Sequence, residues 1–347
     1  MTGGIALILL QQGIVVGAIY ALLALAFVLV FSVSRVLFLP QGQFVVLGTM
    51  TLAQLQAATL PSTIWLLLAL AVAATIWDAA VAIRRRRARG LPFVVLRNLA
   101  LPIILGLLAF WLSPLKLPLP LQVALTLALV VPLGPMIYRL AFQPIAEASV
   151  LVLLIVAVAV DAALVTLSLF FFGAEGWRTA TLAAGRVAFG PLNLSAQQVF
   201  VVATSLVTMV LLSLFFARTV RGKALRATAI NRVGAQLSGI GVNAAGRLAF
   251  GLAAFLGCVS GILIGPISTI FYDSGFLIGL KGFIAMIIGG VVSYPLAVAA
   301  ALAIGVIETF ASFWASAFRD AIICVILIPI LLWQSWSVRA SGREEEE

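Results

Sequence analysis

Long apolar runs, separated by short polar segments, account for most of this chain. The runs lie near residues 5–31, 43–59, 62–83, 92–112, 119–141, 148–172, 196–217, 247–271, 276–290, 294–313 and 319–337. Most of them reach the length of about 20 residues that a helix needs to cross a bilayer. The pattern therefore predicts an all-α, polytopic transmembrane helical bundle with about 9–11 membrane segments.

Two of these runs, 43–59 and 276–290, are short for a full crossing. One interpretation is that they form re-entrant or broken helices. Such segments often line a substrate path, because non-helical backbone at membrane depth must face protein or water. The other interpretation is that they are tilted or buried core helices. The first run, 5–31, is too long for a signal-peptide core and lacks a basic start, so we expect a mature span there.

The composition excludes a soluble globular protein and offers no support for an enzyme. The 347 residues are 64% hydrophobic and 9% charged, and they include no histidine. The two cysteines, Cys258 and Cys324, lie inside apolar runs and are typical of small core residues rather than of a metal site. The sequence contains no phosphate-binding Gly-x-x-x-x-Gly-Lys motif and no paired carboxylates at catalytic spacing. We therefore expect no metal, no cofactor and no ATP hydrolysis by this chain.

The positive charges predict the orientation in the membrane. If the N-terminus lies outside and every run crosses, most Lys and Arg fall on the inner side, as cytoplasmic loops require. These residues are Arg35, Arg84–Arg87, Arg89, Arg97, Arg139, the basic residues of 218–247, Arg339 and Arg343. The C-terminus is then cytoplasmic. Because topology explains the net charge of +10, we expect lipid contact and no nucleic-acid partner.

The loop 218–247 is the most informative segment. It holds six basic residues and no acidic residue between two long apolar runs. Its middle, 235–243, is short and amphipathic, which predicts a helix outside the bilayer that meets a partner. Gly239 can end such a helix by adopting a left-handed conformation.

Charged residues inside apolar runs are costly and indicate either function or buried ion pairs. Four qualify: Asp161, Lys281, Glu308 and Asp320. We expect Asp161 to pair with Lys281 or Arg319, or to face a wet cavity. Lys281, at the head of a short run, is the one that we expect to touch a path.

The segment 226–243 resembles the coupling segment of ABC importer permeases of the branched-chain amino acid type. In that family a short helix ending in Gly-Ile fits a cleft on the ATPase subunit. The resemblance assigns ATPase coupling to these positions: Arg226, Asn231, Arg232, Gln236, Leu237, Gly239 and Ile240.

Other motifs follow in the family's order and extend the resemblance to residues 1–60 and 119–337. They lie at 13–26, 39–44, 138–145, 261–266, 279–283, 289–293, 305–308 and 318–321. There are three departures. Gln41 stands where the family has a histidine, the bulkier Val291 follows Gly289 and Gly290, and residues 60–118 look like an inserted transmembrane hairpin at the periphery.

The resemblance implies one permease domain over 1–340, followed by a disordered acidic tail over 341–347. The outer segment 173–195 is predicted to be a turn-rich flap with a short hairpin. The family motifs that contain them imply that a translocation pathway is lined by Gln41, Gly42, Gln43, Lys281, Gly289, Gly290 and Glu308.

The implied function is import of branched-chain or other hydrophobic amino acids across the inner membrane. The implied partners are ABC ATPase subunits that bind ATP, a second permease (a paralogue or a second copy), and an extracytoplasmic substrate-binding protein. Three alternatives stay open. The cargo can be urea, short amides or aromatic acids, or the chain can be a stand-alone ion-coupled carrier or channel that uses Asp161 and Asp320, or a membrane scaffold. A co-purifying ATPase separates the importer from the stand-alone carrier.

Overall fold

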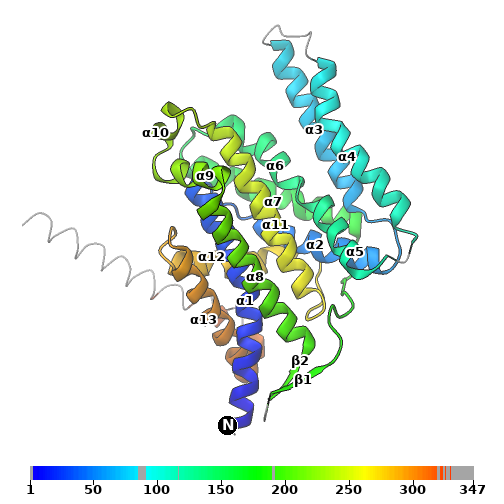
Figure 1. The fold of residues 1–347 in the computed structure, drawn as a ribbon, viewed down its shortest axis with the longest axis vertical. Coiled ribbons are helices and arrows are strands. Elements are labelled where there is room, and N and C mark those ends of the chain that lie inside the picture. Colours follow the sequence, from blue (N-terminus) through cyan, green and yellow to red (C-terminus); the bar gives the residue numbers. More distant parts are fainter. Residues whose placement is uncertain are drawn as a thin grey trace, which may run out of the picture.

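Helices make up nearly all of the computed structural model, which describes residues 3–84, 91–115, 117–189 and 192–318, with positions 321, 322, 325 and 329 (Figure 1). The helices are α1 (Gly3–Ser34), α2 (Gln41–Gln56), α3 (Thr63–Arg84), α4 (Leu91–Leu112), α5 (Leu119–Val130), α6 (Leu133–Ile137), α7 (Val150–Phe172), α8 (Ala196–Arg218), α9 (Val220–Ile230), α10 (Arg232–Leu237), α11 (Val242–Ile264), α12 (Ser274–Ile288) and α13 (Tyr294–Trp314). A π-helix (Tyr138–Phe142) and a 3-10 helix (Gln143–Ile145) follow α6, and a 3-10 turn (Ser316–Phe318) follows α13. The strands are β1 (Arg186–Phe189) and β2 (Leu192–Ser195).

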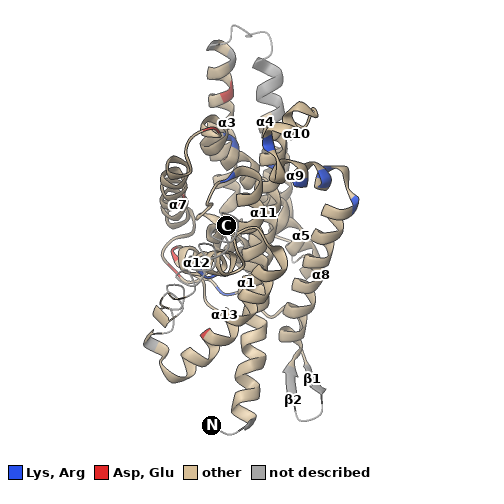
Figure 2. Cartoon of the chain, turned by 90° about the vertical axis from the view of Figure 1, so that its left-hand side faces the viewer, with Lys and Arg blue, Asp and Glu red and all other residues tan. Residues whose placement is uncertain are grey.

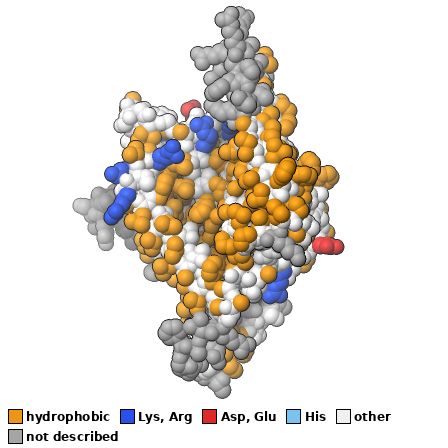
Figure 3. Space-filling model, turned by 45° about the vertical axis from the view of Figure 1, so that its right-hand side comes forward, with side chains coloured by type: hydrophobic (Ala, Val, Ile, Leu, Met, Phe, Trp, Pro, Cys, Tyr) orange, Lys and Arg blue, Asp and Glu red, His pale blue; other side chains and the backbone are white. Residues whose placement is uncertain are grey.

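Within the described residues, seven helices are long and apolar enough to cross a membrane. Two shorter apolar helices, Asn98–Leu112 and α12, accompany them. Hydrophobic side chains cover much of the flank seen in Figure 3, as lipid contact requires. The prediction of a polytopic helical bundle is confirmed. The predicted span 319–337, with Asp320 and Cys324, and the tail 341–347 lie outside the continuously described residues.

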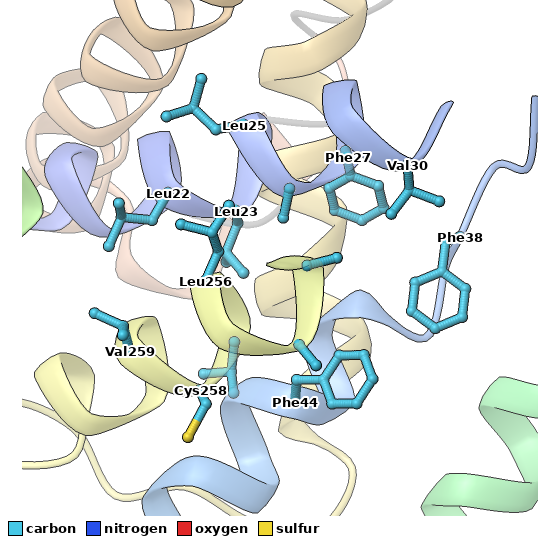
Figure 4. Close-up of a cluster of buried hydrophobic side chains, with 14 of the residues drawn as sticks. Leu22, Leu23, Leu25, Phe27, Val30, Phe38, Phe44, Leu256, Cys258 and Val259 are labelled. Carbon is cyan, nitrogen blue, oxygen red and sulfur yellow. The ribbon is translucent and has the colours of Figure 1, made fainter. Parts of the chain in front are cut away.

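The helix α1 forms the centre of the bundle. Its sequence is apolar on every face, which is typical of a helix buried all round. It packs against α11, α12 and α13, and Figure 4 shows its side chains Leu22 and Leu23 beside Leu256 of α11, in a cluster that also holds Phe27 of α1 and Phe44 of α2. Together with Phe38, these residues form an apolar core that fixes how the neighbouring helices are placed.

The helix α2 is a short helix in the core of the bundle. Its residues from Gln41 to Leu55 are all buried, and it packs between α11 and α12. Glycine permits its closest approach to α12, because a Cβ atom on Gly42 would overlap the carbonyl oxygen of Gly275. The run 43–59 therefore contains a buried helix, and both interpretations of this run require such burial.

Replacing Gly42 with alanine is expected to lower the free energy of unfolding by about 1–3 kcal/mol, the usual cost of overpacking a core. The new methyl group must push α2 away from backbone that cannot yield. A Gly4→Ala variant is the matched control, since nothing lies within 4 Å of a Cβ atom there. Thermal unfolding in detergent measures both variants, and an equal effect of the two would contradict the close packing of α2 on α12.

The segment 173–195 contains the predicted short hairpin. β1 pairs antiparallel with β2, with Arg186 opposite Ser195. Ser195 then caps α8, because its hydroxyl accepts a hydrogen bond from the Gln198 backbone N–H, and the Ser195 backbone N–H donates to the side-chain oxygen of Gln198. The hairpin lies at the same end of the molecule as the N-terminus, whereas α9 and α10 lie toward the opposite end (Figure 1).

The α3–α4 hairpin lies along one side of the bundle, where the predicted insertion was expected (Figure 1). Polar contacts tie it to the core near the end that carries α9 and α10. Asp78 of α3 forms an ion pair with Arg139 of the π-helix. Asn98 of α4 donates to the Asp78 carboxylate at 2.6 Å and accepts from Arg139 at 2.8 Å. These contacts bridge both helices of the hairpin to the segment that follows α6.

Candidate functional site

The helices α9 and α10 form a short helical pair at the end opposite the N-terminus (Figure 2). Side chains cap both of them. Thr219 accepts a hydrogen bond from the Gly222 backbone N–H at 2.9 Å, and Asn231 accepts one from the Gly234 N–H at 2.9 Å. Asn231 also ends α9 in an extended conformation, so this one residue sets the angle between the helices.

Gly239 ends α10 in the left-handed conformation predicted for it, with φ +80°. The Ile240 backbone N–H donates to the Ala235 carbonyl at 2.9 Å, and the Gly239 N–H donates to Gln236 at 3.0 Å. This is a Schellman cap. The predicted bounds were wrong, however. The helix covers 232–237 rather than 235–243, because Asn231 caps it earlier and Gly239 stops it before the turn that leads into α11.

Replacing Gly239 with valine is expected to destabilise this cap by about 1–2 kcal/mol, the cost of a left-handed backbone for a residue with a Cβ atom. On the function that the resemblance implies, uptake should fall severalfold because α10 loses its fixed end. A Gly239→Asn variant is the control, since asparagine tolerates this conformation and should keep most of the uptake. Equal uptake by the two variants would show that the cap has no part in transport.

Apolar side chains of this helical pair face away from the protein. Leu237 is 85% exposed, and Ile230 and Val233 are also largely exposed. Arg226, Asn231 and Gln236 are exposed beside them, while Ala235 is buried and anchors α10 against the bundle. These side chains lie toward the end of the molecule where Lys and Arg gather (Figure 2). A partner protein would bury them.

Two clefts lie near the helical pair of α9 and α10. One, of about 530 Å³, lies between α10 and the segment after α6 and is lined by Gln143, Glu147, Arg232 and Asn243 among others. The other, of about 620 Å³, adjoins Ile240 and is lined by Arg221, Leu225 and Arg247 among others.

A hydrogen bond crosses the first cleft. Arg232 donates to the Ala146 carbonyl at 3.2 Å, which links α10 to the connection before α7. The sequence analysis missed Gln143 and Glu147 as neighbours of α10. The signal for Gln143 was the 138–145 motif, which is distant from Arg232 in the sequence but lies beside it in the fold, and Glu147 directly follows that motif.

Lys281 and Glu308, both predicted for the pathway, form a buried ion pair. The Lys281 ammonium nitrogen lies 2.6 Å from a Glu308 carboxylate oxygen, and each residue is only 6% exposed. The Lys281 nitrogen also lies 5.5 Å from the centre of the Tyr20 ring. Of the partners expected for Asp161, Lys281 was therefore wrong, and Arg319 lies outside the described residues. Asp161 instead lies beside the Gln43 side chain, because α7 packs against α2 rather than against α12.

A cavity of about 430 Å³ adjoins this ion pair. Its lining includes Lys281, Glu308 and Tyr20, together with the polar residues Gln12 and Thr309. The sequence analysis missed Tyr20, Gln12 and Thr309. Their signal was weak, since a single polar residue in an apolar run often has only a structural hydrogen bond.

The remaining predicted pathway residues lie elsewhere. Gln41, Gly42 and Gln43 are buried in the packing of α2, where Gln41 donates to the Ala253 carbonyl of α11 at 2.8 Å. Gly289 and Gly290 form the turn between α12 and α13, with Gly290 at φ +76°. The structure therefore brings together Lys281 and Glu308 but does not place the other five residues on their cavity.

Comparison with known proteins supports a transport role. Residues 99–331 match the family model described as the branched-chain amino acid transport system permease component. The chain is 30% identical over 221 residues to the high-affinity branched-chain amino acid transport system permease protein BraD of Pseudomonas aeruginosa, covering 62% of this chain and 71% of that protein. It is 27% identical to the high-affinity branched-chain amino acid transport system permease proteins LivH of Escherichia coli K12 and Salmonella typhimurium. These matches also span 221 residues, which are 62% of this chain and 71% of each relative. No solved structure matches the chain significantly.

Proposed function

Because the chain belongs to the family of permease components of branched-chain amino acid transport systems, we propose that it carries a branched-chain or other hydrophobic amino acid into the cytoplasm. Separate ATPase subunits supply the energy, and a second permease completes the pathway. An extracytoplasmic binding protein delivers the amino acid to the end that carries the N-terminus and the β1–β2 hairpin.

The observation that carries this proposal is the exposed, rigidly capped helix α10. A short helix fixed at both ends transmits a push without bending, and its exposed Leu237 offers an apolar anchor for a cleft on an ATPase. The basic residues around it favour the cytoplasm, where the ATPases work. That orientation places the N-terminus outside and the C-terminus inside.

The connections of α10 support a route by which its movement would reach the membrane. α11 begins only five residues after α10 ends and packs against α1 and α2 in the core. Arg232 links α10 to the connection before α7. Closure of the ATPases would therefore move α11 and α7 together and switch the pathway between its outward and inward states.

Purification of the chain from its native membrane in mild detergent tests the proposal. Mass spectrometry of the bound proteins is expected to identify an ABC ATPase and a second permease or a second copy of the chain. A chain that stays free of any ATPase, also after crosslinking, would contradict the proposal and favour a stand-alone carrier. Asp161 would then be the first intramembrane acid to test.

A further inference from the structure

The cavity beside Lys281 and Glu308 combines opposite charges with aliphatic walls. The charges come from α12 and α13, and the Tyr20 ring of α1 stands over the Lys281 ammonium group. Aliphatic side chains form much of the rest of the wall: Leu9, Val16, Ile19, Ile264, Ile267 and Ile278. Its volume of about 430 Å³ falls within the range of small-molecule sites, about 300–1,000 Å³.

The position of the cavity suits a molecule that arrives from outside. It is lined by the N-terminal half of α1, the C-terminal half of α13 and the connection between α11 and α12. These segments lie toward the end of the molecule that carries the N-terminus and the hairpin (Figure 1). The connection between α11 and α12 also pairs with the outer segment, since Trp177 and Ile270 exchange backbone hydrogen bonds at 2.9 Å.

We propose that this cavity binds a single aliphatic α-amino acid as its zwitterion. The Lys281 ammonium group contacts the substrate carboxylate, the Glu308 carboxylate contacts the substrate ammonium group, and the aliphatic wall holds the side chain. This inference rests on the proposed function and identifies residues that contact the substrate within it.

The charges of the site select for a zwitterion. An ammonium group donates three hydrogen bonds and a carboxylate accepts about four, so each can hold a ligand while the two stay paired. The four charged groups then alternate in sign around a ring, and no charge is left without an opposite neighbour. A carboxylic acid anion or an amine cation alone would bring an unbalanced charge into a buried site, which is costly.

The rival explanation is an ion pair that only holds α12 and α13 together. The two explanations differ when both charges are removed at once. Replacing a buried ion pair with apolar residues of similar size is often neutral for stability. A double variant Lys281→Met/Glu308→Leu should therefore keep α12 and α13 packed together. It should lose the site for a zwitterion.

The direct test is ligand-dependent thermal stability of the purified transporter complex without its binding protein. The probes are leucine, the anion 4-methylpentanoate and the cation leucinamide. A ligand that binds only the folded state raises the unfolding temperature. We expect leucine to raise it and the two charged analogues to have little effect at the same concentration. The double variant should fold and assemble, yet need about tenfold more leucine or more for the same shift.

The matched control is the double variant Arg139→Met/Asp78→Leu, which removes the ion pair between the π-helix and α3, far along the chain from the cavity. It should respond to leucine like the wild type. The proposal is overturned if leucine gives the wild type no protection, if all three probes protect equally, or if the Lys281/Glu308 double variant responds like the wild type. Import assays on the same complex report separately on the proposed function, because a complex that imports leucine without binding it at this cavity contradicts only the site.

Discussion

Replacing Leu237 with glutamate is expected to abolish amino acid uptake while the chain stays folded in the membrane. Leu237 is 85% exposed, so its loss should change the folding free energy by no more than about 0.5 kcal/mol. In an apolar docking cleft on the partner protein, in contrast, the glutamate would replace a binding hot spot with a buried charge. Loss of a hot spot typically costs about 2 kcal/mol or more of binding free energy, which is roughly a thirtyfold loss of affinity for the partner. Uptake of labelled leucine by vesicles, with the membrane level of the chain measured in parallel, checks the result.

Val220→Glu is the matched control for this experiment. Val220 is 83% exposed at the start of α9, which makes it as accessible as Leu237 but places it away from the end of α10. A glutamate there is also favourable for the helix, because it lies at the positive N-terminal end. The control should import leucine normally. Normal uptake by the Leu237 variant, or an equal defect in both variants, would refute the docking role of α10.

Replacing Lys281 alone with methionine is expected to destabilise the chain by about 3–5 kcal/mol, because it leaves the buried Glu308 carboxylate without its cation. The double variant with Glu308→Leu should recover most of that loss, since neither charge then remains buried. Thermal unfolding in detergent distinguishes the two variants. A double variant that is as unstable as the single variant would mean that packing, rather than charge, sets the stability at this point.

Local patterns in the sequence predicted the framework of the fold. The apolar runs located the long helices, since length and hydropathy alone decide whether a segment can cross a bilayer. Turn chemistry predicted the hairpin that contains β1 and β2, and the conformational freedom of glycine predicted the cap at Gly239. Each of these features depends on residues that are close together in the chain.

Features that depend on tertiary contacts were harder to predict. Lys281 and Glu308 are 27 residues apart on different helices, and only the turn between α12 and α13 brings them together. The sequence offered Lys281 as a partner for Asp161 equally well, because a list of charged residues does not show which helices are neighbours. The burial of Gln41 and Gln43 has the same origin, since α11 and α12 cover α2 from either side.

The bounds of α10 show a third kind of difficulty. The amphipathic pattern over 235–243 continues past the true end of the helix, because Ile240 and Val242 suit both a helix and the turn into α11. The Asn231 cap was visible in the sequence, but its effect depends on α9 ending at the same residue. Local pattern therefore identified the segment that faces a partner and misplaced its start by three residues.

The most direct test of the central claim is leucine uptake into proteoliposomes that contain the purified complex. The binding protein is added outside the proteoliposomes, and ATP is placed on the opposite side of the membrane, inside them. We expect uptake that requires ATP on the side where α10 is exposed and that ceases in the Leu237→Glu variant but not in the Val220→Glu control. Uptake that proceeds without ATP, driven by an ion gradient and unaffected by the Leu237 variant, would contradict the account and identify the chain as a stand-alone carrier.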